Sequence, residues 1–111
     1  MNAEKDLLQK IASQLLIDGQ WRASSDGNTL PVRDPATGEI LKEISSASVQ
    51  DGIDAVEAAD RAFPAWAATP PRVRADILRR AFDLVQERKE DFALLMTIEM
   101  GKPLAEARGE V

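Results

Sequence analysis

The spacing of apolar residues changes abruptly at Ser48, and this change limits the possible folds more than any other feature of the sequence. Before Ser48, short apolar runs are separated by turns that contain Pro and Gly, a pattern typical of small antiparallel strands. After Ser48, apolar residues recur with the period of a helix face. The sequence therefore predicts an α+β chain in which an N-terminal helix and small antiparallel strands precede three or four helices.

The strand region is expected to follow one short amphipathic helix. Asp18-Gly19 separates two short apolar segments, and this dipeptide favours a type I′ hairpin turn because both of its residues tolerate positive φ. Pro31 cannot donate to a strand ladder, so its strand should lie at an edge. We predict a helix over residues 3–14 and strands over about 15–17, 20–23, 30–33 and 39–44.

The helical region carries clear start and stop signals. Ser48 and Asp51 resemble a capping box. Pro64 is expected to end the first long helix, and Thr69 and Pro70 are expected to be the N-cap and first residue of the next one. Helices are predicted over about 48–63, 70–88, 90–100 and 103–111.

The apolar faces of these helices are the expected core. The first two faces carry Val49, Ile53, Val56, Ala59 and Phe63, and then Val73, Ile77, Ala81, Leu84 and Val85. Trp21 and Trp66 could stack on a ligand, but packing in a core or interface is the favoured interpretation. The open strand edges and a final helix without a C-cap predict an incomplete unit that associates with other surfaces.

The chemical inventory of the chain is narrow. Its 111 residues include no Cys and no His, which excludes thiol nucleophiles, disulfides and the usual zinc ligands. The balance of 14 basic against 19 acidic side chains argues against nonspecific nucleic-acid binding. No run approaches the roughly 20 apolar residues of a membrane span. The first six residues are too acidic for a secretory signal, so we expect a cytoplasmic protein without nucleic-acid or membrane partners.

Glu99 has the most unusual position of the polar residues. It shares a helix face with Phe92 and Met96, close to the helix end expected at Gly101. The helix dipole disfavours a carboxylate there. Three alternatives follow: an ion pair with Lys102, exposure to solvent, or coordination of a hard cation through oxygen.

The other charged residues give weaker signals. Lys102 lies in a Gly-Lys-Pro segment without the spaced glycines of a phosphate-binding loop, so a solvated lysine is the favoured interpretation. A basic run on the helix after Pro70 is interleaved with Asp76 and Asp83, which indicates a mixed-charge solvent face and not a nucleic-acid site. The run consists of Arg72, Arg74, Arg79 and Arg80.

Five segments, taken in order, resemble the N-terminal end of the aldehyde dehydrogenase superfamily. They are IDGQW at 17–21, VRDPATGE at 32–39, the alanine-rich helix at 55–66, the segment RVRADIL at 72–78 and TIEMGKPLAEA at 97–107. Asp34 stands where the family more usually has Asn. Residues 96–111 are most similar to the succinate-semialdehyde and glutarate-semialdehyde branch.

The resemblance implies that residues 1–111 are the N-terminal part of the cofactor-binding domain of an α/β enzyme, with the catalytic domain absent. Enzymes of this family oxidise aldehydes to acids with NAD or NADP, using a Cys thiolate and a water activated by Glu. Those residues and the cofactor loops come later in the family. The parent protein is thus expected to be a homo-oligomer acting on a small aldehyde, whereas this chain alone should be inactive and bind no nicotinamide cofactor. The alternatives are a free-standing helical interaction module and a product without a role.

The resemblance also implies a site for a monovalent cation, Na⁺ or K⁺. Many members bind such an ion with an acidic side chain at the position of Glu99 and a backbone carbonyl in the strand that matches Val32-Arg33. Oxygen ligands of this kind suit a hard cation. The predicted ligands are the Glu99 carboxylate and the Val32 carbonyl.

Overall fold

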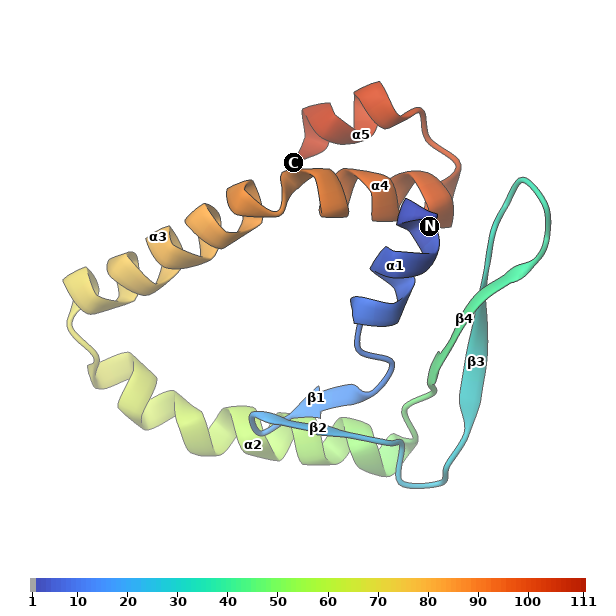
Figure 1. The fold of residues 1–111 in the computed structure, drawn as a ribbon. Coiled ribbons are helices and arrows are strands. Elements are labelled where there is room, and N and C mark those ends of the chain that lie inside the picture. The colour runs from blue at the N-terminus through green and yellow to red at the C-terminus, as the bar shows by residue number, and fades with distance from the viewer. Residues whose placement is uncertain (1) are drawn as a thin grey trace.

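The structure is a computed structural model that describes residues 2–111. Its elements follow the predicted order of a helix, four strands and then further helices (Figure 1). They are α1 (Ala3–Lys10), β1 (Leu15–Ile17), β2 (Gln20–Arg22), β3 (Thr29–Arg33), β4 (Ile40–Ser45), α2 (Val49–Ala68), α3 (Pro71–Glu87), α4 (Lys89–Met100) and α5 (Leu104–Glu110). The α+β class is confirmed.

The strands form two separate antiparallel pairs. β1 pairs with β2, and β3 pairs with β4 with Leu30 opposite Ile44. Asp18 and Gly19 have φ values of 52° and 72°, so the hairpin predicted at this dipeptide is confirmed. Because each sheet in residues 2–111 has only two strands, every strand is an edge strand, as Pro31 requires.

Helix α1 is shorter than predicted. It ends at Lys10 instead of residue 14, and Ile11 leaves in an extended conformation with φ −79° and ψ 129°. Tertiary contacts from β4 override the helical pattern here: the Lys42 ammonium binds carbonyls at the helix end, and the Ser13 carbonyl accepts the Ser45 N–H at 2.8 Å. The residues expected to extend the helix instead lead directly into β1.

Pro64 does not end α2, contrary to the prediction. The helix continues to Ala68, because one proline removes a single backbone donor and the alanines that follow favour helix. Thr69 then caps its C-terminal end: its N–H donates to the Trp66 carbonyl at 3.1 Å and its hydroxyl donates to the Ala65 carbonyl at 2.8 Å.

The predicted start of the next helix is therefore wrong by one residue. Thr69 serves α2 and not α3, whose N-cap is Pro70 and whose first residue is Pro71. Proline suits both positions because its fixed φ matches the first helical turn and its missing N–H has no partner there. The other predicted helix boundaries differ from the observed ones by a few residues at most.

The helices enclose an open frame instead of a compact core. Figure 1 shows α2, α3 and α4 along three sides, with α1 and the β1–β2 hairpin closing the fourth. The radius of gyration is 17.0 Å, against about 13 Å for a compact chain of this length. The accessible surface is 8111 Å², against about 6,000 Å² for a compact protein of this mass. The buried apolar residues in the described part are Leu7, Ala58, Ala93, Ile98 and Ala107.

The apolar faces expected to form the core are largely exposed. Val56 and Phe63 on α2 are 70% and 65% exposed, and Leu78 on α3 is 68% exposed. Trp21 and Trp66 are also exposed, so the packing predicted for them is not found within this chain. The periodicity identified the apolar faces correctly, but residues 2–111 supply too little protein to cover them. No helix in this part of the chain has the length and hydropathy that a membrane span requires.

Gly101 ends α4 and lies against Pro35 in the turn between β3 and β4, and it gives a first prediction. Its φ is +82°, and a Cβ at this position would lie 3.2 Å from Pro35 Cγ. Gly101→Ala should therefore lower the local stability of the α4–α5 corner by about 1–2 kcal/mol. Hydrogen exchange of residues 97–105 measures this change.

Gly109→Ala is the matched control. Gly109 is helical with open space around it, so this substitution should raise the stability of α5 by about 0.5–1 kcal/mol. Equal exchange in both variants would contradict the prediction.

Candidate functional site

The two predicted cation ligands lie on one cavity of about 160 Å³ between α1, the β3–β4 hairpin and α4. The cavity is lined by Leu8, Ile11, Val32, Leu41, Lys42, Ile44, Leu95 and Glu99. Lys42 and Glu99 are its charged members. The structure thus brings Glu99 and Val32 together although they are far apart in the sequence. Acidic side chains in residues 2–111 do not gather in groups of three or more that could hold a metal ion, so any ion here would depend on carbonyl oxygens.

Glu99 does not pair with Lys102, which was one of the three alternatives. Lys102 instead contacts the Glu110 carboxylate, and its side chain is only 13% exposed, so the solvated lysine expected at this position is also not found. Lys102 precedes α5, and its side chain reaches the carboxylate of Glu110, the last residue of that helix, which runs back along α4 (Figure 1). Glu99 itself is exposed at the C-terminal end of α4.

The α4–α5 pair is held by a second charged contact. The Arg108 guanidinium donates to both carboxylate oxygens of Glu90 at 2.9–3.1 Å. This contact lowers the pKa of the Glu90 carboxyl and raises the pKa of Arg108. Beneath it, Ala93 and Ala107 are completely buried, and their small side chains let the two helices approach closely. This arrangement holds the N-terminal half of α4, the helix that carries Glu99 at its other end, against α5.

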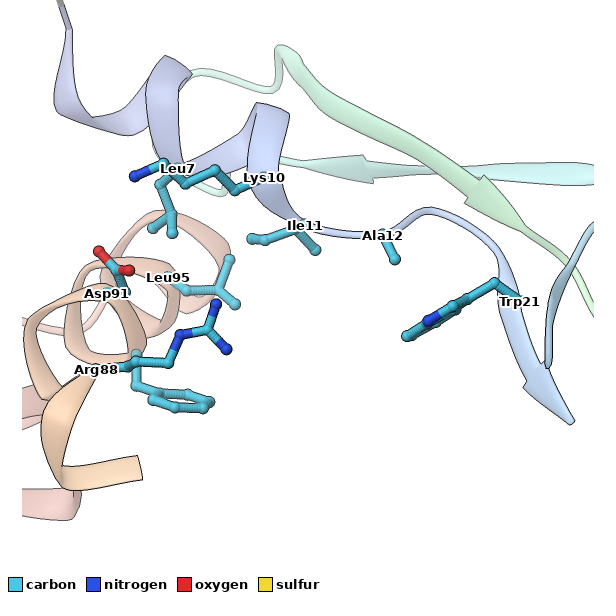
Figure 2. A pocket seen from close by; sticks show the side chains of 9 residues that line it. Leu7, Lys10, Ile11, Ala12, Trp21, Arg88, Asp91 and Leu95 are labelled. Carbon is cyan, nitrogen blue, oxygen red and sulfur yellow. The ribbon is translucent and has the colours of Figure 1, made fainter. Parts of the chain in front are cut away.

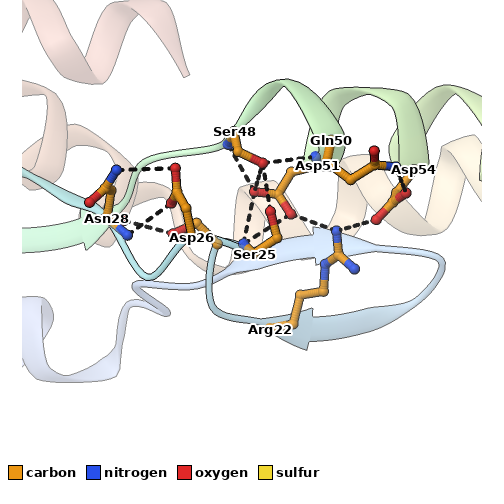
Figure 3. Close-up of polar contacts among 9 residues, drawn as sticks. Arg22, Ser25, Asp26, Asn28, Ser48, Gln50, Asp51 and Asp54 are labelled. Carbon is orange, nitrogen blue, oxygen red and sulfur yellow. Dashed lines mark hydrogen bonds and ion pairs between the residues drawn. The ribbon is translucent and has the colours of Figure 1, made fainter.

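Asp51 is the fully buried acidic side chain of the described region, and it joins the N-terminus of α2 to the first hairpin (Figure 3). One carboxylate oxygen accepts from the Arg22 guanidinium at 2.7 Å. The other accepts from the Ser48 N–H at 2.8 Å and the Ser48 hydroxyl at 3.0 Å. The Ser25 N–H donates to both oxygens. The capping box predicted at Ser48 and Asp51 is confirmed.

The surroundings of Asp51 stabilise its charged form. The hydrogen bond from the Ser48 N–H contributes most to lowering the pKa of the Asp51 carboxyl, with further bonds from Ser25 and the Ser48 hydroxyl and the charge of Arg22 acting in the same direction. Arg22 also binds Asp54 at 2.9 Å, and the pKa of Asp54 is lowered by Gln50 and Arg22. Because every oxygen of Asp51 has donors within the chain, this cluster is a structural joint and not an acid–base centre.

A larger cavity of about 420 Å³ opens into the middle of the frame. Figure 2 shows Trp21 on one side of it, facing Arg88 and Leu95 of the α4 region across a wide gap, with Ile11 and Ala12 between. Its lining is mainly apolar, with Lys10, Arg88 and Asp91 at the rim. The half-exposed indole of Trp21 indicates a surface that further protein would cover.

The basic run on α3 forms the mixed-charge face that the sequence predicts. Arg79 pairs with Asp83 and Arg80 pairs with Glu87, both at 3.6 Å between exposed side chains. The Arg79 guanidinium also lies 5.1 Å from the centre of the Phe82 ring. Exposed pairs of this kind contribute little to stability.

The sequence interpretation missed two residues, Lys42 and Arg22. Lys42 shares a strand face with Ile40 and Ile44, and a charged residue flanked in this way is a signal for a specific partner. Arg22 carries no comparable signal, because its acidic partners are 29 and 32 residues away along the chain.

Comparison with known proteins gives consistent matches. Residues 21–111 match the sequence model of the aldehyde dehydrogenase family. The chain is 49% identical over 98 residues to the glutarate-semialdehyde dehydrogenase of Pseudomonas aeruginosa, covering 88% of this chain and 20% of that protein. It is 67% identical over 72 residues to the succinate-semialdehyde dehydrogenase of Paenarthrobacter nicotinovorans, covering 65% of this chain and 16% of that protein.

A solved structure shows the same arrangement of elements. The betaine aldehyde dehydrogenase of Staphylococcus aureus in complex with NAD⁺ matches with a TM-score of 0.94 at 29% identity, covering 96% of this chain and 22% of that one. The chain spans about a fifth of the length of the relatives it matches. The open frame is thus the conformation that the corresponding segment has inside a larger enzyme. With the family model matched over most of its length, the chain belongs to the aldehyde dehydrogenase family.

Proposed function

We propose that this chain is the N-terminal portion of a cytoplasmic, NAD(P)-dependent dehydrogenase that oxidises succinate semialdehyde, or a similar semialdehyde, to the acid. The observation that carries the proposal is the identity of 49% and 67% to two semialdehyde dehydrogenases. The betaine aldehyde dehydrogenase, which acts on a different aldehyde by its name, shares only 29%.

The proposed role of residues 1–111 is to form the outer part of the cofactor-binding domain, and the longer protein is proposed to be a homo-oligomer. The exposed apolar faces of α2 and α3 support this role because they need a large surface to cover them. The nucleophile must come from elsewhere in the protein, since this sequence has no Cys. The chain alone is therefore proposed to be inactive.

A direct assay tests both parts of the proposal. The full-length product of the gene should reduce NAD⁺ or NADP⁺ with succinate or glutarate semialdehyde and give a kcat/KM at least about 100-fold higher than with betaine aldehyde. The 111-residue chain, assayed in parallel, should give no reduction above the rate without enzyme. Turnover by the purified 111-residue chain, or a preference of the full-length protein for betaine aldehyde, would refute the corresponding part.

The exposed helix faces also favour a second candidate, a free-standing helical interaction module. The two candidates differ in what covers α2 and α3: further residues of the same polypeptide, or another protein. The coding sequence after Val111 separates them. Continuation into a region with a Cys nucleophile supports the dehydrogenase, and a stop codon directly after Val111 supports the module.

We further propose that a Na⁺ or K⁺ ion binds in the full-length enzyme between the Glu99 carboxylate and the Val32 carbonyl. The shared cavity and the unfavourable position of a carboxylate at a helix C-terminus support this site. The presence of Lys42 in the same cavity works against it, because an ammonium and a metal ion repel each other.

A further inference from the structure

Lys42 lies where the C-terminal end of α1 meets β4. Its half-buried ammonium donates to the carbonyls of Leu8 and Ile11, the latter at 2.5 Å. These carbonyls belong to the negative end of the α1 dipole, which favours a cation. The position of Lys42 is therefore fixed by α1, independently of Glu99.

Glu99 faces the same cavity from α4. At the end of that helix the left-handed Gly101 caps the backbone, with its N–H bonded to the Thr97 carbonyl at 2.9 Å. The carboxylate lies at the negative end of the α4 dipole and gains from a nearby positive charge. Lys102 is engaged with Glu110, and residues 2–111 show no ion pair within 4.0 Å of Glu99. Lys42 is the one cation among the residues that line the cavity.

The cavity thus contains one fixed ammonium and one carboxylate, and its net charge is already zero. A metal ion that enters would be attracted by Glu99 and repelled by Lys42. With the ammonium removed, the same ion would meet an uncompensated carboxylate together with the carbonyls that Lys42 had bound. The charge of Lys42 should therefore decide how tightly the cavity holds a monovalent cation.

We infer that Lys42 is an internal competitor of Na⁺ and K⁺ at Glu99, so that the ammonium serves as the counter-charge and external cations bind weakly while it is present. This inference rests on the proposed cation site at Glu99 and Val32, and it adds a residue that determines the affinity of that site. Lys42 acts through charge and hydrogen bonds to α1, not through contact with a substrate.

The full-length protein is titrated with KCl or NaCl against choline chloride at constant ionic strength, with the thermal unfolding temperature as the readout. Lys42→Gln removes the charge and keeps an N–H donor for the α1 carbonyls, and Lys42→Met provides a second uncharged variant. Lys42→Arg is the matched control that retains the charge. We expect the uncharged variants to bind K⁺ or Na⁺ at least about tenfold more tightly than the wild type and Lys42→Arg.

The double variant Lys42→Gln/Glu99→Gln should lose this gain, because the carboxylate is then also absent. If the wild type and the uncharged variants reach half of their stabilisation at the same cation concentration, Lys42 does not compete with the cation, although the cation site itself is still supported. A response that survives in the double variant would overturn it as well, since the ion would then bind elsewhere. If no protein responds to either cation, the proposed cation site itself fails and the competition with it.

Discussion

Replacing Asp51 with asparagine is expected to speed hydrogen exchange in residues 48–54 about 10- to 100-fold at neutral pH. The carboxylate is completely buried and accepts from Arg22, Ser25 and Ser48. An asparagine has only one acceptor oxygen, so its amide would place a donor against the Ser25 or Ser48 N–H. The variant therefore loses the charge that holds Arg22 and leaves buried donors without partners. Exchange measured by mass spectrometry on the 111-residue chain gives the rate.

Asp54→Asn is the matched control for this change. Asp54 also binds Arg22, at 2.9 Å, but its side chain is about one-third exposed and water can replace the lost contact. We expect less than about threefold faster exchange for Asp54→Asn. Similar rates in the two variants would mean that the buried Asp51 network does not hold the hairpin to α2.

Acid provides an independent test of the same carboxylate. The pKa of Asp51 is lowered by folding, so its contribution to stability is complete above its unfolded pKa of about 3.9 and is lost as the pH falls through the lower folded value. Wild-type chain should lose helical circular dichroism as the pH drops below about 4, and more steeply than Asp51→Asn, which has no proton to bind there. Folding also lowers the pKa values of Asp54 and Glu90, so these two carboxyls reduce stability in acid in the wild type and in the variant alike.

The sequence predicted correctly those turns and helix ends that depend only on residues close together in the chain. The Asp18-Gly19 turn and the Ser48–Asp51 capping box are confirmed because each depends on residues within a few positions. The end of α4 at Gly101 is confirmed for the same reason, since a left-handed residue after a helix requires no distant partner.

The predictions are wrong where residues further away in the sequence make the contact that decides the local structure. α1 ends early because Lys42, more than 30 residues away, takes the carbonyls that a longer helix would have used. Lys102 pairs with Glu110, which is eight residues further along the chain at the far end of α5, a spacing that the helical pairing rule considered for Glu99 does not cover. For the candidate site, the sequence singled out Glu99 from its place on a helix, whereas the resemblance to the family supplied Val32 and neither indicated Lys42.

The isolated 111-residue chain should associate and bind hydrophobic dyes. Its accessible surface of 8111 Å² exceeds that of a compact protein of equal mass by about 2,000 Å². This excess is comparable to the total area that a stable protein interface buries. We expect gel filtration at micromolar concentration to give an apparent mass well above 12.1 kDa, and anilinonaphthalene sulfonate fluorescence to rise about tenfold.

Three substitutions on the exposed faces test whether those faces cause the association. Val56→Glu, Phe63→Glu and Leu78→Glu together should return the chain toward a monomer and reduce dye fluorescence by about half or more, because each places a charge where apolar contact would form. Ala62→Glu, Ala75→Glu and Ala105→Glu form the matched control, with the same added charge at exposed alanines. If both triple variants became monomeric, net charge would explain the result. A wild-type chain that is monomeric and binds no dye would show that residues 1–111 cover their own apolar faces in solution.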